Sequence, residues 1–324
     1  MTGPPGRPRC PGSGSNGSME KIPYLGQTMV RWRVGGSTFL ALPERGARLM
    51  NWNIEMADGS VRDVIHWPEI SSLAEFHKAR GGNPILFPFC ARSFDRGDVG
   101  FWRDALDVRR TMPMHGLARQ GVFGATRLDP GGFETVFVPG VEAAACYPFQ
   151  YEFRVDYRFA AFGLTCKLTL ENLGEEPLPW CAGHHFYFTL PWNEGSARGD
   201  YLIRIPADLR LRQDAAGHLV PGPRLAPFER MDNPALVETF HTELRSSEVV
   251  FGEEGQPGDV AIRLGTDPVP PSGATFVTWT QADDSPFYCV EPWMGPANAP
   301  EHKTGLHLVP PGASETFTVS VSVR

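Results

Sequence analysis

The chain has 324 residues, of which 41% are hydrophobic and 21% are charged, and its formal net charge is −7. The length allows a sizeable core, and the mild acidic excess argues against a nucleic-acid partner, which would need a basic surface. The six cysteines form no C-x-x-C pair, so we interpret them as reduced thiols rather than as a zinc or thioredoxin-type site. No apolar run approaches the ~20 residues of a spanning helix, so we expect no membrane partner and, by default, a cytoplasmic location.

The start of the chain differs in composition from the rest. Gly, Pro and Ser dominate residues 1–18, and no apolar segment of a secretory signal accompanies the early arginines. We therefore expect a disordered tail over residues 1–22. Residues 23–324 contain no linker, and we expect them to form a single domain.

The two-residue periodicity of half-buried strands dominates residues 23–324. Tyr151–Phe159 alternates apolar with charged residues, so one face of this strand should be buried. The same alternation recurs in Leu164–Glu171, Val260–Leu264, Phe276–Thr280 and Phe317–Val323. Gly and Pro clusters separate the strands as turns, and the best helical candidates are two short stretches, Ser71–Arg80 and Leu236–Leu244. Many strands with little helix predict an all-β protein, a large antiparallel β-sandwich.

Two polar residues in the first half of the chain stand in settings that suit a binding site. Arg92 ends the apolar run 83–91, where its guanidinium could enter a pocket as a fixed fork of donors or remain at the rim. His115 precedes Gly116 and follows a proline closely, which indicates a loop that enters a strand. A histidine suits proton transfer near neutral pH, but a structural role explains this position equally well.

Two adjacent histidines, His184 and His185, lie within the apolar, aromatic run Trp180–Phe188. Successive side chains of a strand point to opposite faces, so at most one of the two should serve a given site. A metal site built from both histidines is therefore not expected.

Glu291 carries the sharpest signal in the sequence. It ends the apolar run 286–290 and precedes Pro292. A carboxylate in such a strand is costly unless it is paired, protonated or functional. Partial burial would raise its pKa and make it a better base. The alternative interpretation is a carboxylate at the end of a strand that turns to solvent.

Aromatic residues and missing motifs narrow the chemistry. Indole faces suit the apolar C–H faces of sugars, although buried packing is their commoner use; five tryptophans lie near the candidate segments: Trp102, Trp180, Trp192, Trp279 and Trp293. The sequence has no G-x-G-x-x-G, P-loop, H-E-x-x-H or G-x-S-x-G motif. We therefore expect no nucleotide cofactor, no metal and no serine hydrolysis.

Four segments, in this order, resemble the aldose 1-epimerase (mutarotase) family and the related hexose-6-phosphate 1-epimerases. They are the apolar run Pro84–Arg92, the sequence HGLAR at His115–Arg119, the central run that ends in Gly183-x-His185-x-Tyr187-Phe188, and Cys289–Ala299. The resemblance extends from about Tyr24 to the C-terminus. It implies the large β-sandwich of galactose mutarotase, with the site in a cleft on one sheet.

The same resemblance implies roles for individual residues. Glu291 would be the general base and His185 the general acid, because the H-x-Y-F spacing selects His185 over His184. The other implied residues would bind and orient a sugar: Arg92, His115, Trp293, Glu238 and Arg80. A carboxylate and an imidazole on either side of a sugar ring can open and close it without metal or cofactor.

One departure from the family leaves the substrate open. Sugar mutarotases carry an Asp that contacts sugar hydroxyls, and Val237 stands in its place here, with Glu238 beside it and Asp232 a few residues earlier. The predicted function is therefore interconversion of the α- and β-anomers of a sugar, with a small-molecule sugar as the partner. A non-catalytic carbohydrate-binding relative is one alternative.

The second alternative is a hexose-6-phosphate 1-epimerase. The run Arg80-Gly81-Gly82-x-Pro84 resembles the phosphate-sugar branch of the family. In that interpretation, Arg80, Arg96 and Arg103 would form a phosphate pocket, whereas a scattered set of arginines is more often surface charge. The sequence gives no oligomeric state.

Overall fold

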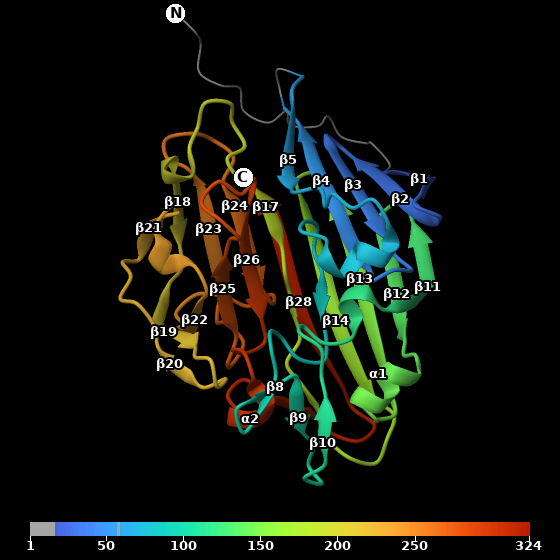
Figure 1. The fold of residues 1–324 in the computed structure, drawn as a ribbon. Helices are drawn as coiled ribbons and strands as arrows, with labels where there is room; N and C mark the ends of the chain where they lie inside the picture. The colour runs from blue at the N-terminus through green and yellow to red at the C-terminus, as the bar shows by residue number, and fades with distance from the viewer. Residues whose placement is uncertain (1–16, 57–58) are drawn as a thin grey trace, which may run out of the picture.

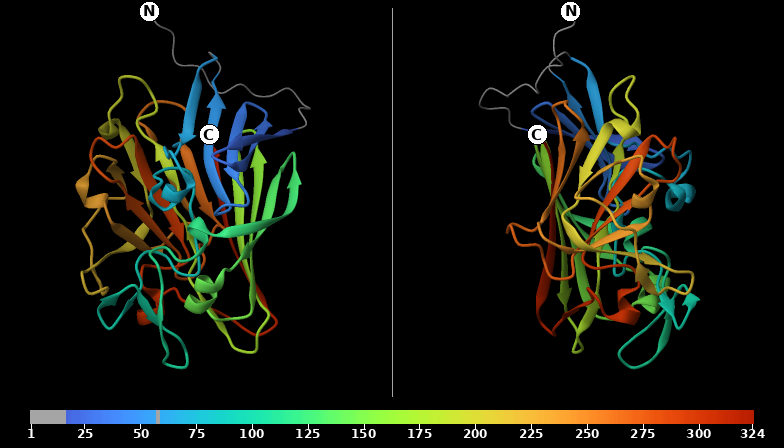
Figure 2. Two further views of the ribbon diagram at one scale, coloured as in Figure 1. Left: turned by 45° about the vertical axis from the view of Figure 1, so that its right-hand side comes forward. Right: turned by 90° about the vertical axis from the view of Figure 1, so that its left-hand side faces the viewer.

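The computed structural model describes residues 17–56 and 59–324. Two large antiparallel sheets, of 13 and 9 strands, make up most of the described chain. They lie face to face as two layers (Figures 1 and 2). This arrangement confirms the predicted all-β sandwich. The described residues contain no helix with the length and apolar character needed to span a membrane.

The 13-stranded sheet joins strands from both ends of the chain. Its main order is β1 (Ser18–Tyr24), β2 (Gln27–Val34), β3 (Ser37–Leu42), β4 (Arg48–Glu55), β5 (Val61–Ile65), β17 (Tyr187–Thr189), β26 (Phe287–Trp293), β25 (Thr275–Trp279), β22 (Thr239–Leu244), β19 (Ala207–Gln213) and β20 (Leu219–Pro221). A short strand, β16 (Gly183–His184), pairs with both β26 and β6 (Ile85–Leu86). The three-residue strand β17 therefore connects the N-terminal strands to the C-terminal ones.

The 9-stranded sheet forms the other layer. Its order is β11 (Val122–Asp129), β12 (Gly132–Val138), β13 (Tyr151–Ala160), β14 (Gly163–Asn172), β28 (Ser314–Val323), β24 (Val260–Leu264), β23 (Glu248–Glu253), β18 (Tyr201–Arg204) and β21 (Phe228–Arg230). Three two-stranded ribbons pair β7 (Phe94–Asp95) with β8 (Asp98–Val99), β9 (Phe101–Arg103) with β10 (Arg109–Thr111), and β15 (Leu178–Trp180) with β27 (His307–Val309).

Helices are short wherever the structure describes the chain. The α-helices are α1 (Val141–Cys146) and α2 (Ala299–His302), and the 3₁₀ helices are η1 (Leu73–Lys78), η2 (Ala118–Gln120), η3 (Arg198–Asp200) and η4 (Pro234–Leu236). The helix expected within Ser71–Arg80 is present as η1. The prediction of a helix over Leu236–Leu244 is wrong, because Thr239–Leu244 forms β22. Pairing with β19 and β25 on both edges, and β-branched threonines, favour the strand there.

The N-terminal segment also differs from the expectation. Of the tail predicted over residues 1–22, residues 1–16 lie outside the described residues. Ser18–Tyr24 is not disordered but forms β1, which pairs with β2 along its whole length. A tight turn at Leu25 and Gly26 joins the two strands, and Met19 packs against the core, which explains why this segment is ordered.

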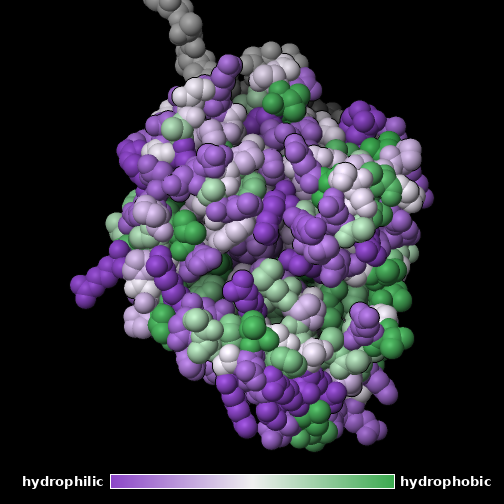
Figure 3. All heavy atoms as spheres, viewed as in Figure 1, coloured by the Kyte–Doolittle hydropathy of each residue, from purple (hydrophilic) through white to green (hydrophobic). Residues whose placement is uncertain are grey.

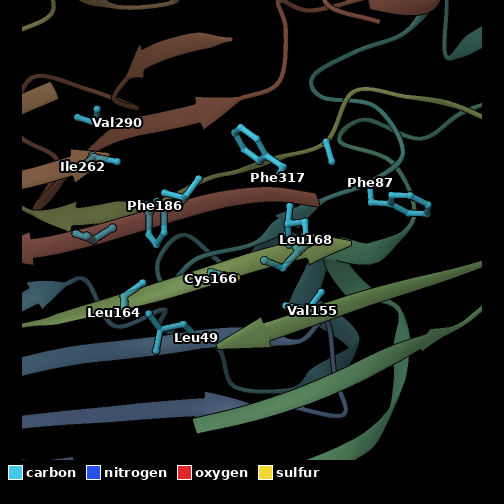
Figure 4. Close-up of a cluster of buried hydrophobic side chains, with 14 of the residues drawn as sticks. Leu49, Phe87, Val155, Leu164, Cys166, Leu168, Phe186, Ile262, Val290 and Phe317 are labelled. Carbon is cyan, nitrogen blue, oxygen red and sulfur yellow. The ribbon is translucent and has the colours of Figure 1, made fainter. Parts of the chain in front are cut away.

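The hydrophobic core fills the space between the two sheets. Val290 reaches it from the 13-stranded sheet, and Ile262, Leu168 and Phe317 reach it from the 9-stranded sheet (Figure 4). The predicted strands Tyr151–Phe159, Leu164–Glu171, Val260–Leu264, Phe276–Thr280 and Phe317–Val323 correspond to β13, β14, β24, β25 and β28. The alternation of β13 and β14 was readable because one face of each strand enters this core and the other meets solvent.

Strand β26 is buried on both faces, unlike β13. Tyr288 and Val290 point into the core between the sheets, whereas Phe287, Cys289 and Glu291 point to the opposite face. Other segments cover that outer face. The face of the molecule seen in Figure 3 is largely hydrophilic, with hydrophobic residues in small groups.

Candidate active site

A pocket of about 400 Å³ lies where these segments cover the 13-stranded sheet. All seven site residues expected from the sequence line it: Arg80, Arg92, His115, His185, Glu238, Glu291 and Trp293. They come from five separate parts of the chain, and pairing of β26 with β16, β17 and β25 brings several of them together. The pocket has a buried floor and a charged, exposed rim.

The floor holds Glu291 and His185 as a close pair. Nε2 of His185 lies 3.4 Å from Oε2 of Glu291, and the two residues are only 7% and 2% exposed. Burial raises the pKa of the Glu291 carboxyl well above its usual value. Burial, with added repulsion from His115 and nearby arginines, lowers the pKa of His185. The Glu291 Oε2 and His185 Nδ1 atoms have no hydrogen-bond partner among the described residues.

His115 stands beside this pair in a fixed orientation. Its ring lies 5.2 Å from that of His185, edge to face. The backbone N–H of Ala91 donates to His115 Nδ1 at 3.2 Å, and the His115 N–H donates to the Ala91 carbonyl at 2.7 Å. Burial and the charge of Arg119 lower the pKa of His115 to about 3, so the ring is neutral at neutral pH. Because Nδ1 accepts, the ring proton resides on Nε2, which is left as a donor.

The backbone is strained at three pocket residues. Ala91, His115 and Glu238 have φ values of 58°, 66° and 57°, in the left-handed region that side chains other than glycine rarely adopt. Such conformations persist where the surrounding structure enforces them, and they concentrate at functional sites. Here the reciprocal hydrogen bonds between Ala91 and His115 hold two of the three in place.

Gly116→Ala is expected to lower the free energy of unfolding by about 2–4 kcal/mol. Gly116 has a φ of +75°, and a Cβ there would lie 2.0 Å from the carbonyl oxygen of Phe87. Gly124→Ala is the control, because a Cβ at Gly124 meets nothing within 4 Å, and its effect should stay within about 0.5 kcal/mol. Urea unfolding measures both, and equal losses would show that this close approach does not matter.

The rim carries Arg80, Arg92 and Glu238, whose side chains are exposed. The guanidinium of Arg80 lies 5.4 Å from the ring centre of Trp279. Buried Arg48 donates to the carbonyls of Ala79 and Gly81 at 3.0 and 2.5 Å, so it fixes the segment that carries Arg80.

The two adjacent histidines face opposite ways, as the alternation predicted. His184 is fully buried, and its ring stacks near Phe317 of the 9-stranded sheet, so it belongs to the core side. His185 stacks on Tyr187 and faces the pocket. Asn83 links the two, because its side chain contacts His184 Nδ1 at 3.0 Å and accepts the His185 backbone N–H at 3.0 Å.

Some expected residues lie elsewhere. Arg96 and Arg103 line a separate pocket. The prediction that they form a phosphate pocket with Arg80 is therefore wrong. Arg103 is bound to the carboxylate of Asp95 at 2.8 Å, which already neutralises it. Asp232 lies near Gly199, outside the lining of the candidate site. Val237, by contrast, lines the pocket together with Glu238.

Other lining residues were missed. Arg212, Gln213 and Asp214 come from the end of β19 and the turn after it, and Phe240 comes from β22. No local pattern marked the three residues of β19 and its turn, because β19 reaches the pocket only through its pairing with β22. Trp279 was one of the five tryptophans noted above, but nothing singled it out for the pocket.

Known structures share this architecture. A galactose mutarotase-like protein from Clostridium acetobutylicum superposes with a TM-score of 0.76 at 18% identity, over 95% of this chain and 98% of that chain. A galactose 1-epimerase from Lactobacillus acidophilus superposes with a TM-score of 0.64 at 15% identity, over 95% of this chain and 98% of that chain. The fold is therefore that of the galactose mutarotase-like proteins.

Sequence comparison identifies the family. The pattern of the aldose 1-epimerase family matches residues 29–264, and the chain belongs to that family. The chromosomal protein LacX of Lactococcus lactis subsp. lactis is 22% identical over 236 residues, which cover 66% of this chain and 74% of LacX. Glu291 lies after the matched segment, so the family match does not include it. The structure places it in the pocket.

Proposed function

We propose that this chain is an aldose 1-epimerase that interconverts the α- and β-anomers of a sugar in the cytoplasm. The observation that carries the proposal is the buried pair of Glu291 and His185, 3.4 Å apart on the floor of a pocket. A carboxylate and an imidazole so placed can serve as general base and general acid. The five cysteines that the structure describes are free thiols, in agreement with a reducing compartment.

The proposed reaction needs two proton movements at opposite ends of the sugar's C1–O5 unit. Glu291 takes the proton of the C1 hydroxyl while His185 protonates the ring oxygen, and the ring opens to an aldehyde. The aldehyde turns about the C1–C2 bond. Closure from the other face then returns both protons, His185 acting as base and Glu291 as acid.

The remaining pocket residues would position the sugar for this exchange. The Nε2–H of His115 and the guanidinium of Arg92 are donors for sugar oxygens, and Trp293 offers an apolar ring face. Glu238 and Arg80 on the rim would contact outer hydroxyls. Glu238 is the natural substitute for the family's missing Asp, because Val237 beside it has no polar atom in its side chain.

Glu291 and His185 share one proton, and burial determines which of the two groups carries it. Burial disfavours both the carboxylate of Glu291 and the imidazolium of His185, so the proton rests on Glu291 in the ligand-free pocket. The form with the proton on His185 has the same net charge. Passage of one proton across the gap therefore produces the working form without exchange with solvent.

The direct test is polarimetry on freshly dissolved α-glucose and α-galactose. The first-order rate of equilibration should rise in proportion to protein concentration. The non-catalytic alternative makes a different prediction, namely sugar binding in calorimetry without any acceleration. A protein that neither binds nor accelerates any of a panel of aldoses and hexose 6-phosphates would refute the proposal.

A specific observation supports the 6-phosphate alternative. Arg80, Arg92 and Arg212 line the pocket, and none of them forms an ion pair with a carboxylate among the described residues. Guanidiniums without a carboxylate partner suit the two or three oxygens of a phosphate.

The rim arginines therefore decide between free and phosphorylated sugars. If the substrate is a hexose 6-phosphate, Arg92→Gln should lower kcat/KM for it by about 10–100-fold, the value of a charged hydrogen bond. Arg204→Gln is the control, because Arg204 lies on β18 beside Phe228 and outside this pocket. A preference of the wild type for the free aldose, with equal effects of both variants, would exclude the phosphate.

A further inference from the structure

A third polar group lies beside the proposed acid–base pair, and the epimerase chemistry does not use it. Cys289 is two residues before Glu291 on β26, so its side chain points to the same outer face. Donor atoms of His185, Cys289 and Glu291 all lie within 4.8 Å of one another, and all three residues are buried.

The three donors are of the types that bind Zn²⁺ in proteins. Imidazole nitrogen, thiolate sulfur and carboxylate oxygen bind Zn²⁺ at about 2.0–2.3 Å, so neighbouring ligand atoms of a tetrahedral site lie about 3.3–3.7 Å apart. The gap of 3.4 Å between His185 Nε2 and Glu291 Oε2 already fits. The sulfur lies within 4.8 Å of the other two donors, so it must approach by at most about 1.5 Å, within the reach of a side-chain adjustment.

A second feature points to a ligand at this place. Oε2 of Glu291 is buried without a hydrogen-bond partner among the described residues. A buried polar atom in that condition is costly, and it is satisfied when a ligand arrives. The open pocket above the pair provides a path by which an ion can enter.

We propose that His185, Cys289 and Glu291 form a binding site for a borderline divalent cation such as Zn²⁺, and that the bound ion blocks the acid–base pair. On binding, the Cys289 thiol and the Glu291 carboxyl release their protons to solvent, and the ion exchanges water for S⁻, O⁻ and N ligands. The thiolate and carboxylate supply two negative charges, which balance the ion among the nearby arginines. Inhibition rests on the function proposed above, whereas binding does not.

The binding test uses Zn²⁺ and Co²⁺ with the full-length protein. Zinc should bind in calorimetry with proton release, seen as a dependence of the heat on the buffer. Cobalt should give the absorption of a thiolate–metal bond. Cys289→Ala should lose this band and weaken zinc binding by at least about tenfold, whereas Cys90→Ala, which removes another buried thiol, should retain both.

Thermal unfolding and anomerisation rates, each measured with and without zinc, complete the test. Zinc should raise the thermal unfolding midpoint of the wild type and Cys90→Ala but not of Cys289→Ala, which also shows that each variant is folded. For each protein, the ratio of anomerisation rates with and without zinc should show inhibition that Cys289→Ala escapes. Equal zinc affinity in the wild type and Cys289→Ala would overturn the proposal. Absence of anomerase activity would remove only the inhibition, since calorimetry and cobalt absorption are independent of turnover.

Discussion

Glu291→Gln is expected to lower the rate of anomer interconversion by about 10²–10⁴-fold, the usual contribution of one general acid–base group. The amide keeps the shape of the side chain but cannot accept the C1 hydroxyl proton. The pair of Glu291 and His185 should act as a unit, so the double variant Glu291→Gln/His185→Gln should lose little more than either single variant. Polarimetry or one-dimensional NMR of the anomeric protons measures all of these rates.

Two controls separate chemistry from misfolding. Glu291→Gln should not lower the free energy of unfolding, because the amide is a neutral group of the same shape as the buried, protonated carboxyl that it replaces. Glu238→Gln removes a carboxylate from the exposed rim, so it should alter KM more than kcat. A wild-type rate in Glu291→Gln would exclude Glu291 as the base.

The second large effect is on stability in mild acid. Burial lowers the pKa of His115, His184 and His241 to about 3 in the folded protein, against about 6.5 in an unfolded chain. Between these two values the unfolded state binds more protons, so stability rises with pH and is lost as the pH falls below 6.5. Each histidine removes about 2 kcal/mol at pH 5, and the three together remove about 6 kcal/mol.

A loss of that size is a large part of the 5–15 kcal/mol that holds a typical domain together. Urea unfolding at pH 8, 6.5 and 5, in a buffer with a chelator, measures it. His241→Asn should reduce the loss by about 2 kcal/mol, whereas His77→Asn, a substitution at an exposed position of η1, is the control. A stability that stays constant from pH 8 to pH 5 would show that these rings are solvated.

Alternation in the sequence predicted the strands that have one wet face. The strand Tyr151–Phe159 can be recognised in the sequence because Arg154 and Asp156 meet solvent while Val155 and Tyr157 meet the core. Strand β26 shows no alternation because both of its faces are buried. Periodicity therefore could not say which face of β26 carries the site. For Leu236–Leu244, the local pattern gave the wrong element, since pairing partners distant in the sequence decide that segment.

The site was predictable where short motifs carry it and unpredictable elsewhere. Arg92, His115, His185 and Glu291 each stand in a recognisable motif, and the pocket contains all four. Arg212 stands in no motif and enters through the pairing of β19 with β22.

Residues that are close in the sequence do not always share a site. Arg96 and Arg103 are close to Arg92 along the chain, yet they line a different pocket. Nearness along the sequence does not reveal that the chain leads these two arginines to another pocket. It also does not reveal the ion pair between Arg103 and Asp95.

The short strand β17 has a consequence for how this protein folds. It pairs with β5 from the first part of the chain and with β26 from the last part, and the pocket floor exists only when the second pairing is complete. Contacts between residues so distant in sequence close slowly, because chain entropy must be lost before they form. The pocket should therefore appear late during refolding, after hairpins such as β13–β14, and the return of ligand binding would time the last step of assembly.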